Sequence, residues 1–395
     1  MRNWMLGLFV AALFTNGYSD DWSVWRGPNH NGISGETGWN PKGTEKLWTK
    51  ELGDGYSSVS VKGGRLYTMG LKSGDDKTDM VYCLDAKTGN EIWSYSYASP
   101  SGSYKGPRAT PVCDEDSVYT FSRDGQLICF AAESGKVKWK TDVLASSVNK
   151  NITWGLASSP VIEEDLILLN VGATGVAVDK NSGKIKWKST GTSSYASPVL
   201  FDHNGTRCAA IFSAPGLQIV EAQTGKKIGS LAWETKYEIN GADPLIIGDK
   251  IFISSGYDHG CAMLDFSSGE LKVLWENKLL KAQFSSSVYI DGYIYGVDGQ
   301  TKSKGLLRCI SAADGFEQWN APLGFGSLMA ADGRLIALSE NGTLCIADAS
   351  PKKYNELAKT VTGLSPLCWT APVLANGVIY CRNDKGTLVA IDVSK

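Results

Sequence analysis

Histidine and unbalanced charge are scarce in this sequence. Its 395 residues contain 3 histidines, His30, His203 and His259, and none of them has the spacing of a metal-ligand pair. The formal net charge is −2, and no basic stripe or zinc-finger spacing occurs. We therefore expect no metal site and no nucleic-acid partner. A Gly-x-Ser-x-Gly elbow and a phosphate-binding loop are also missing, so the sequence gives no motif for hydrolysis of esters or nucleotides.

Long apolar runs are absent except near the N-terminus. Arg2 precedes a run from Trp4 to Phe14, which is too short to span a bilayer. The small residues Gly17 and Ser19 follow it and suit signal peptidase. The sequence therefore predicts a signal peptide over residues 1–19 and one exported domain over 20–395. We expect that domain in the periplasm or outside the cell, as a monomer without a transmembrane segment.

An internal repeat dominates the rest of the chain. One phrase ends in a turn glycine followed by tryptophan, and its six glycines lie 42 to 48 residues apart. The glycines are Gly89, Gly135, Gly183, Gly225, Gly269 and Gly315. Tryptophan stands four residues after the first three of them and after Gly315, while Trp233 and Trp275 belong to looser copies.

A second phrase opens each repeat and is followed by hairpin signals. It occurs eight times, centred on Val59, Pro111, Pro160, Pro198, Pro244, Ser287, Leu328 and Pro372. Turns such as Asp291-Gly292 and Asn376-Gly377 then separate short apolar runs, which is typical of β-hairpins. Four short strands in each repeat, without helical periodicity, predict an all-β, eight-bladed β-propeller.

The last repeat ends at residue 392 without a fourth strand. Residues 45–51 contain Glu45-Lys46-Leu47-Trp48, which matches a repeat ending but has no blade of its own. We expect this N-terminal strand to complete the last blade and close the ring, which removes an open sheet edge. Residues 20–44 would then form an N-terminal clasp across one face.

The repeated residues have simple physical roles. An acidic residue such as Asp85 or Asp179 is expected to accept hydrogen bonds from the turn amides. The glycine supplies a left-handed backbone conformation, and the tryptophan fills the wedge between blades. Three of the nine cysteines, Cys83, Cys129 and Cys309, occupy one repeated core position; the sequence does not decide how the other six pair.

These residues carry a family resemblance. The recurring acidic-Ser/Thr-Gly-Lys-x-x-Trp phrase resembles the propeller repeat of pyrroloquinoline quinone (PQQ) proteins. The opening Trp22-Ser23-Val24-Trp25-Arg26-Gly27-Pro28 resembles the start of exported bacterial PQQ-like propellers, which are labelled BamB-like or polyvinyl-alcohol dehydrogenase-like. The resemblance implies an axial pocket in which PQQ and Ca²⁺ could bind. The chain departs from the quinoprotein dehydrogenases because it lacks both their adjacent cysteine pair and the Cys-x-x-Cys-His haem motif.

One position points to the ring axis. The residues three before the centre of the opening phrase read Tyr56, Arg108, Ala157, Tyr195, Gly241, Phe284, Phe325 and Trp369. Inner strands begin near the central channel, so five aromatics and one arginine, with Asp243 nearby, form a candidate cofactor-binding ring. The alternative is that these aromatics only plug the channel or pack between blades.

The sequence thus leaves two functions open. The first is a binding or scaffolding propeller in the cell envelope, with a protein or polymer partner. The second is a PQQ-dependent dehydrogenase that oxidises alcohol groups of a small or polymeric substrate. No catalytic residue and no calcium ligand can be identified from the sequence.

Overall fold

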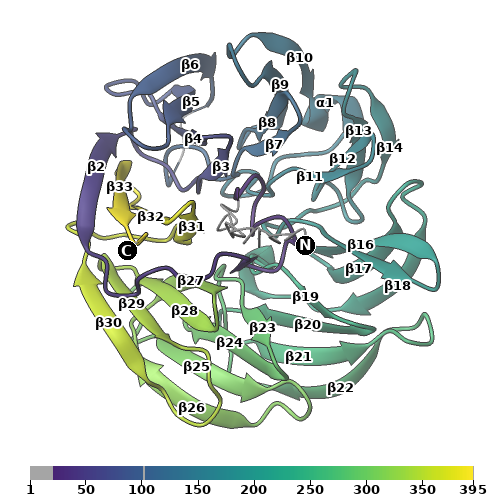
Figure 1. The fold of residues 1–395 in the computed structure, drawn as a ribbon. Coiled ribbons are helices and arrows are strands. Elements are labelled where there is room, and N and C mark those ends of the chain that lie inside the picture. The colour runs from purple at the N-terminus through teal and green to yellow at the C-terminus, as the bar shows by residue number, and fades with distance from the viewer. Residues whose placement is uncertain (1–20, 101–102, 395) are drawn as a thin grey trace, which may run out of the picture.

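Eight four-stranded antiparallel sheets are arranged as blades around a central axis. A computed structural model describes residues 21–100 and 103–394, and Figure 1 shows the ring with the chain running round it in order. The eight-bladed propeller predicted from the repeat is therefore confirmed. The predicted signal peptide lies outside the described residues. No helix among the described residues is long and apolar enough to cross a membrane.

The first four blades follow one another along the chain. Blade 1 comprises β3 (Ser60–Lys62), β4 (Arg65–Leu71), β5 (Thr78–Asp85) and β6 (Glu91–Ala98). Blade 2 comprises β7 (Val112–Asp114), β8 (Ser117–Phe121), β9 (Gln126–Ala131) and β10 (Val137–Asp142). Blade 3 comprises β11 (Val161–Glu163), β12 (Leu166–Leu169), β13 (Val176–Asp179) and β14 (Ile185–Lys188). Blade 4 comprises β15 (Val199–His203), β16 (Thr206–Ser213), β17 (Gly216–Glu221) and β18 (Lys227–Ala232).

The other four blades complete the ring. Blade 5 comprises β19 (Leu245–Ile247), β20 (Lys250–Ser255), β21 (Gly260–Asp265) and β22 (Lys272–Asn277). Blade 6 comprises β23 (Val288–Ile290), β24 (Tyr293–Asp298), β25 (Leu306–Ser311) and β26 (Glu317–Pro322). Blade 7 comprises β27 (Gly326–Ala331), β28 (Arg334–Ser339), β29 (Thr343–Asp348) and β30 (Glu356–Val361), with β1 (Ile33–Ser34) added parallel to β27. Blade 8 comprises β31 (Val373–Ala375), β32 (Val378–Arg382), β33 (Thr387–Asp392) and β2 (Glu45–Glu51). Two short helices, α1 (Val143–Ser147) and η1 (Lys236–Glu238), lie between blades.

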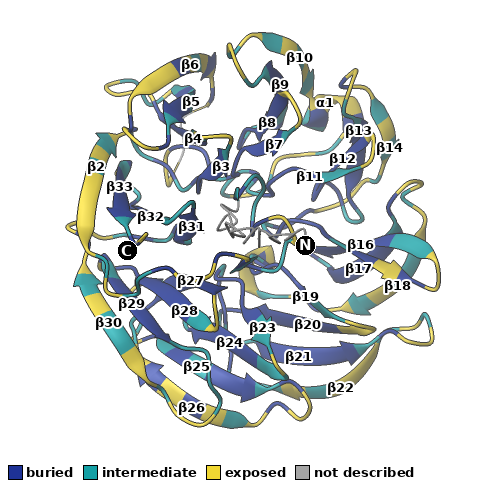
Figure 2. Ribbon diagram, viewed as in Figure 1, coloured by how far each residue is buried: buried dark blue, intermediate teal, exposed yellow. Residues whose placement is uncertain are grey.

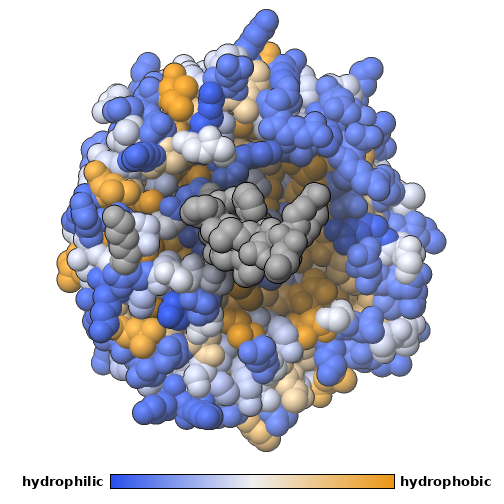
Figure 3. All heavy atoms as spheres, in the orientation of Figure 1, coloured by the Kyte–Doolittle hydropathy of each residue, from blue (hydrophilic) through white to orange (hydrophobic). Residues whose placement is uncertain are grey.

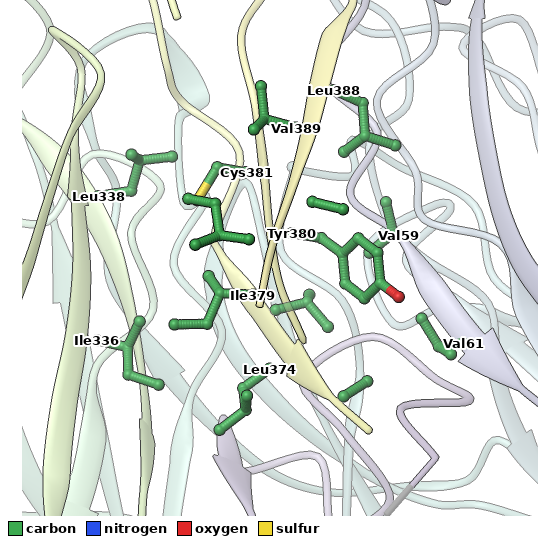
Figure 4. Packing of buried hydrophobic residues seen from close by; sticks show 14 of the residues in the cluster. Val59, Val61, Ile336, Leu338, Leu374, Ile379, Tyr380, Cys381, Leu388 and Val389 are labelled. Atoms are coloured by element: carbon green, nitrogen blue, oxygen red, sulfur yellow. The ribbon is translucent and has the colours of Figure 1, made fainter. Parts of the chain in front are cut away.

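The N-terminal strand closes the ring as predicted. β2 pairs antiparallel with β33, from Glu45 opposite Asp392 to Glu51 opposite Thr387. Arg382 of blade 8 also reaches blade 1, where its guanidinium donates to the carbonyls of Ser57 and Met69. Figure 4 shows blades 7, 8 and 1 sharing one apolar core around Tyr380. The first and last parts of the chain therefore form a continuous structure.

Burial follows the distance of each strand from the axis. The inner strands are largely buried, whereas the outermost strands β2, β10 and β14 alternate between exposed and partly buried residues (Figure 2). The outermost strand β6 is mostly exposed, with Trp93 and Tyr97 buried. All nine cysteines are free and buried. The repeated cysteine position is therefore a packing position, and none of the thiols left unassigned by the sequence forms a disulfide.

Adjacent blades are joined by a tryptophan on a glycine. The indole of Trp93 in blade 1 lies against Gly135 in the turn of blade 2, where a Cβ would come within 2.6 Å of the ring. The indole N–H donates to the Ala132 carbonyl at 2.9 Å. The same arrangement recurs at four other seams, with the pairs Trp48–Gly89, Trp139–Gly183, Trp187–Gly225 and Trp275–Gly315. The glycine is therefore needed for close approach as well as for its positive φ.

The seam between blades 4 and 5 corrects the assignment of Trp233. Gly229 stands opposite Ile219, at the register position that tryptophan holds in other blades, and the ring of Phe266 from blade 5 fills the vacated space. Trp233 instead donates to the Ser255 hydroxyl and contacts the His259 ring at a tilt of 50°, with ring centroids 4.3 Å apart. The large aromatic side chain at this seam therefore comes from blade 5 instead of blade 4. The space between the blades is still filled, although the residue pattern of the repeat is not followed.

Two glycine substitutions separate these effects. Gly135→Ala and Gly269→Ala both place a side chain at positive φ, +68° and +80°, but only Gly135 faces an indole; the nearest atom to Gly269 is His203 Nε2 at 3.9 Å. We expect Gly269→Ala to lower the free energy of unfolding by about 1 kcal/mol. We expect Gly135→Ala to cost about 1–3 kcal/mol more, because the indole must shift. Urea unfolding followed by tryptophan fluorescence measures the free energy of unfolding of both variants. Equal losses of stability would contradict the role assigned to the contact between Trp93 and Gly135.

Candidate functional site

A cavity of about 250 Å³ lies on the ring axis. Its wall combines the starts of the inner strands, the loops between blades and part of the N-terminal segment. Figure 3 shows hydrophobic residues on the wall of a hollow near the centre of the face in view. Each inner strand runs from this wall toward a hairpin, so the cavity has one end at the interblade loops and one at the hairpins.

Most of the residues predicted at the axis do line this cavity. Six of the seven predicted binding residues belong to its wall: Tyr56, Arg108, Tyr195, Asp243, Phe284 and Trp369. Phe325 does not, because a short connection from β26 to β27 holds it in blade 7, where its carbonyl accepts from the Glu340 amide at 2.7 Å. Its ring packs edge-on against Phe284 with centroids 4.9 Å apart, so it supports the wall from behind.

The aromatic side chains contact one another around part of the wall. Tyr56 and Trp369 stack with ring centroids 5.2 Å apart and planes inclined by 22°. Phe284 lies 5.4 Å from Trp369 on its other side. Burial raises the pKa of both Tyr56 and Tyr195 to about 12, so these phenols stay protonated at neutral pH. The wall is thus apolar but carries hydroxyl groups.

Arg108 is the cation of this wall. Its guanidinium carbon lies 5.5 Å from the centre of the Tyr56 ring. Two of its nitrogens donate to the carbonyls of Gly106 and Tyr104, at 2.8 and 2.7 Å. Among the described residues it forms no ion pair with a carboxylate. Burial lowers the pKa of Arg108 to about 10, which still leaves the group charged at neutral pH.

Three tyrosines from loops stand at the same end of the cavity, and sequence reasoning missed them. Tyr104, Tyr237 and Tyr257 have φ of 55°, 64° and 57°, which is an uncommon conformation for bulky residues. Tyr104 lies 5.8 Å from Trp369, while Tyr237 lies 5.6 Å from Tyr257 and 6.1 Å from Trp154. We call this end, with Tyr56, Arg108, Trp154, Tyr195, Phe284 and Trp369, the aromatic mouth.

A belt of hydrogen bonds holds the wall together, and it was also missed. The residue just before the centre of the opening phrase carries a hydroxyl or carboxylate in seven of eight blades. In successive blades its amide donates to the side-chain oxygen of its counterpart, at 2.7–3.2 Å: Ser58 to Thr110, Thr110 to Ser159, Ser159 to Ser197, Ser197 to Asp243, and Asp243 to Ser286. The repeated Ser/Thr before proline was the signal for it.

Residues 21–34 cross the hairpin end and form the floor of the cavity. Trp22 bridges to Val61, and β1 pairs with β27 (Figure 1). Trp25 Nε1 donates to Asp243 at 2.6 Å, and Arg26 Nε lies 3.9 Å from the same carboxylate oxygen. Burial raises the pKa of Asp243, and the positive charge of Arg26 opposes that rise. Asp243 is therefore occupied with the floor and with the belt.

The wall does not fit PQQ with calcium. Calcium takes six to eight oxygen ligands, usually with several carboxylates. The described residues contain no group of three His, Cys, Asp or Glu side chains that could hold a metal ion, and Asp243 already accepts from Trp25 and Ser197. The described cysteines offer no reactive thiol at the mouth either, because burial raises their pKa, to about 12 at Cys113 and Cys368.

Replacement of Asp243 tests the floor. Asp243→Asn removes the charge that faces the buried Arg26 and sets an amide against the Trp25 indole. We expect a loss of about 3–5 kcal/mol in the free energy of unfolding, because a buried cation loses its partner. Limited proteolysis should then cut within residues 21–44 before the blades. Asp114→Asn, which breaks the more exposed pair with Lys180, should cost less than about 1 kcal/mol. Unchanged protection of the segment would contradict this account.

Curated relatives share the name outer membrane protein assembly factor BamB. The protein from Moranella endobia (strain PCIT) is 20% identical over 303 residues, covering 70% of this chain and 71% of the relative. The protein from Escherichia coli (strain K12) is 21% identical over 359 residues, covering 87% and 88%.

Solved structures with the same fold include a BamB protein and an alcohol dehydrogenase. BamB from Moraxella catarrhalis superposes with a TM-score of 0.63 at 13% identity, covering 88% of this chain and 97% of that one. Quinohemoprotein alcohol dehydrogenase from Comamonas testosteroni gives 0.70 at 14% identity, covering 96% and 82%. At this identity the superpositions establish the fold alone. The family described as outer membrane protein assembly factor BamB matches residues 77–321 and 303–395 of the sequence, and the chain belongs to that family.

Proposed function

We propose that this chain is an exported propeller of the cell envelope that binds a protein partner at its aromatic mouth and catalyses no reaction. Membership of the BamB family favours a partner in the assembly of outer membrane proteins. Its site of action would be the periplasm, after removal of a signal peptide at residues 1–19, with the propeller itself a monomer.

One observation carries the proposal: the mouth offers contact surface without reactive groups. Tyr104 is 51% exposed and Tyr237 is 56% exposed, whereas Tyr56, Tyr195, Phe284 and Trp369 on the wall are partly buried. Exposed aromatic side chains beside an arginine are typical of protein-binding surfaces, where they contribute most of the affinity. The nearest carboxylate on the wall, Asp243, is buried under hydrogen bonds and cannot act on a ligand.

The quinoprotein alternative predicts a different use of the same cavity. A dehydrogenase would need calcium ligands and an electron path, and the donor set at the wall is too small for the first. The alternative has its own test. Addition of PQQ and Ca²⁺ should produce neither stoichiometric quinone absorbance nor dye-linked alcohol oxidation, and turnover would contradict the proposed function.

Site-specific photo-crosslinking tests the binding surface. A photoreactive phenylalanine replaces Tyr237 at the mouth or, as the control, Phe316, which is 69% exposed in the turn before β26 of blade 6. In cells of the native host we expect a discrete protein adduct from position 237 and none of that mass from position 316. Mass spectrometry of the adduct should identify a component of the outer membrane. Equal adducts from both positions, or none from 237, would exclude the mouth as the contact surface.

A further inference from the structure

The aromatic mouth combines three features that its role in the fold does not explain. It holds an arginine without a carboxylate partner, aromatic rings with exposed faces, and three tyrosines in a costly backbone conformation. Elsewhere in the ring, buried arginines either meet an acid or are surrounded by carbonyls. Arg123 lies 3.5 Å from Asp79, and Arg382 donates to four oxygens.

The charge of Arg108 is incompletely neutralised in the folded protein. Its two hydrogen bonds go to neutral carbonyls, and a guanidinium has five N–H donors in all. A cation partly withdrawn from water and left without an anion is unfavourable, and a carboxylate that enters the cavity would correct this. Because guanidinium and carboxylate match in a planar, two-bonded geometry, a carboxylate is the favoured anion.

The tyrosine conformations point in the same direction. Non-glycine residues at positive φ cost about 1–2 kcal/mol each, and such residues gather at sites where a ligand is held. Here three separate segments, the β6–β7 connection, η1 and the β20–β21 hairpin, each hold a tyrosine in this conformation. None of the three belongs to the repeated packing positions. Tyr104 contacts Trp369, Tyr237 contacts Trp154 and Tyr257, and Tyr104 and Tyr237 are more than half exposed.

We propose that the aromatic mouth binds a ligand that carries one carboxylate and one aromatic ring, with the carboxylate on Arg108 and the ring beside Tyr104 and Trp369, which are in contact and both line the cavity. Of the two arginines that line the cavity, Arg26 already faces Asp243, so Arg108 alone is available to one carboxylate, which distinguishes this ligand from a polycarboxylated quinone. The ring packs edge-on or offset against these two side chains, as aromatic pairs prefer. This inference deepens the proposed function, since the same chemistry occurs where an aromatic and an acidic residue adjoin in a partner's chain.

Calorimetric titration with small probes tests the inference without the partner. Phenylacetate should bind to the purified protein, and phenylacetamide, the neutral analogue of the same shape, should bind at least tenfold more weakly. Cyclohexylacetate keeps the charge without the aromatic ring and should also bind more weakly. Equal affinity for phenylacetate and phenylacetamide would overturn the inference. So would the absence of binding heat with every probe up to about 10 mM, which corresponds to a dissociation constant weaker than a specific site would show.

Variants locate the contacts. Arg108→Gln should reduce phenylacetate affinity about tenfold or more and leave phenylacetamide unchanged, because only the charged contact is lost. Tyr104→Ala should weaken both probes, because Tyr104 lines the cavity. Arg334→Gln is the matched control, since Arg334 also lies over an aromatic ring, Trp39, at 5.3 Å, but does not line the cavity. Equal effects of Arg108→Gln and Arg334→Gln would count against the assignment, and thermal melts show that each variant is folded.

A peptide arm separates the two sources of the ligand. The capped peptide Gly-Asp-Tyr-Gly should bind more tightly than its Asn analogue if the inference holds. If it also binds more tightly than phenylacetate, the ligand is a chain segment; if phenylacetate is tighter, it is a free aromatic acid. Because the probes require no partner, probe binding without a crosslinked adduct would refute only the proposed function. An adduct at position 237 without probe binding would refute only the present inference.

Discussion

The contact between the tryptophan of one blade and the turn glycine of the next is the constraint on which the ring depends. A four-stranded blade is too small to bury its own faces, so its stability comes from its neighbours. At five seams the indole occupies the space that a Cβ would need, and its N–H is bonded to a carbonyl across the seam. These contacts fix how closely the blades approach at the outer radius, and the belt at the axis does the same at the inner radius. The wall of the cavity is therefore held in place by contacts at both the outer and the inner radius of the ring.

Much of this architecture could be predicted from the sequence, because the opening phrase of the repeat occurs eight times and each copy marks one blade. The period gave the number of blades, the Asp-Gly and Asn-Gly pairs marked the hairpins, and the unmatched ending at Trp48 located the closing strand. The seam at Gly229 shows the limit. There the large residue moves to Phe266 on the facing blade, while a tryptophan happens to follow at position 233. Matching by residue type assigned the wrong tryptophan, since packing conserves volume across a contact and not identity along a chain.

The candidate site divides in the same way. Residues on the inner strands, such as Tyr56 and Trp369, could be placed at the axis because their distance from the repeat is constant. Phe325 has the same spacing, yet the short connection before β27 draws it behind the wall. Tyr104 and Tyr237 lie in connections between blades, and Tyr257 lies in the hairpin between β20 and β21; these segments differ in length from their counterparts, so alignment of the repeat does not place them. Their position depends on left-handed backbone conformations that nothing in the residue types announces.

The N-terminal segment, which is not part of the repeats, determines how charge is distributed between the two ends of the cavity. Trp25 donates a hydrogen bond to Asp243 and Arg26 forms an ion pair with it. This carboxylate therefore does not neutralise a cation at the mouth. Arg108 is left at the opposite end without an acid of its own. Because Trp22, Trp25 and Arg26 line the hairpin end of the cavity, we expect a ligand to enter from the mouth. The unbalanced positive charge of Arg108 at the mouth therefore follows from the use of Asp243 by Trp25 and Arg26 at the floor.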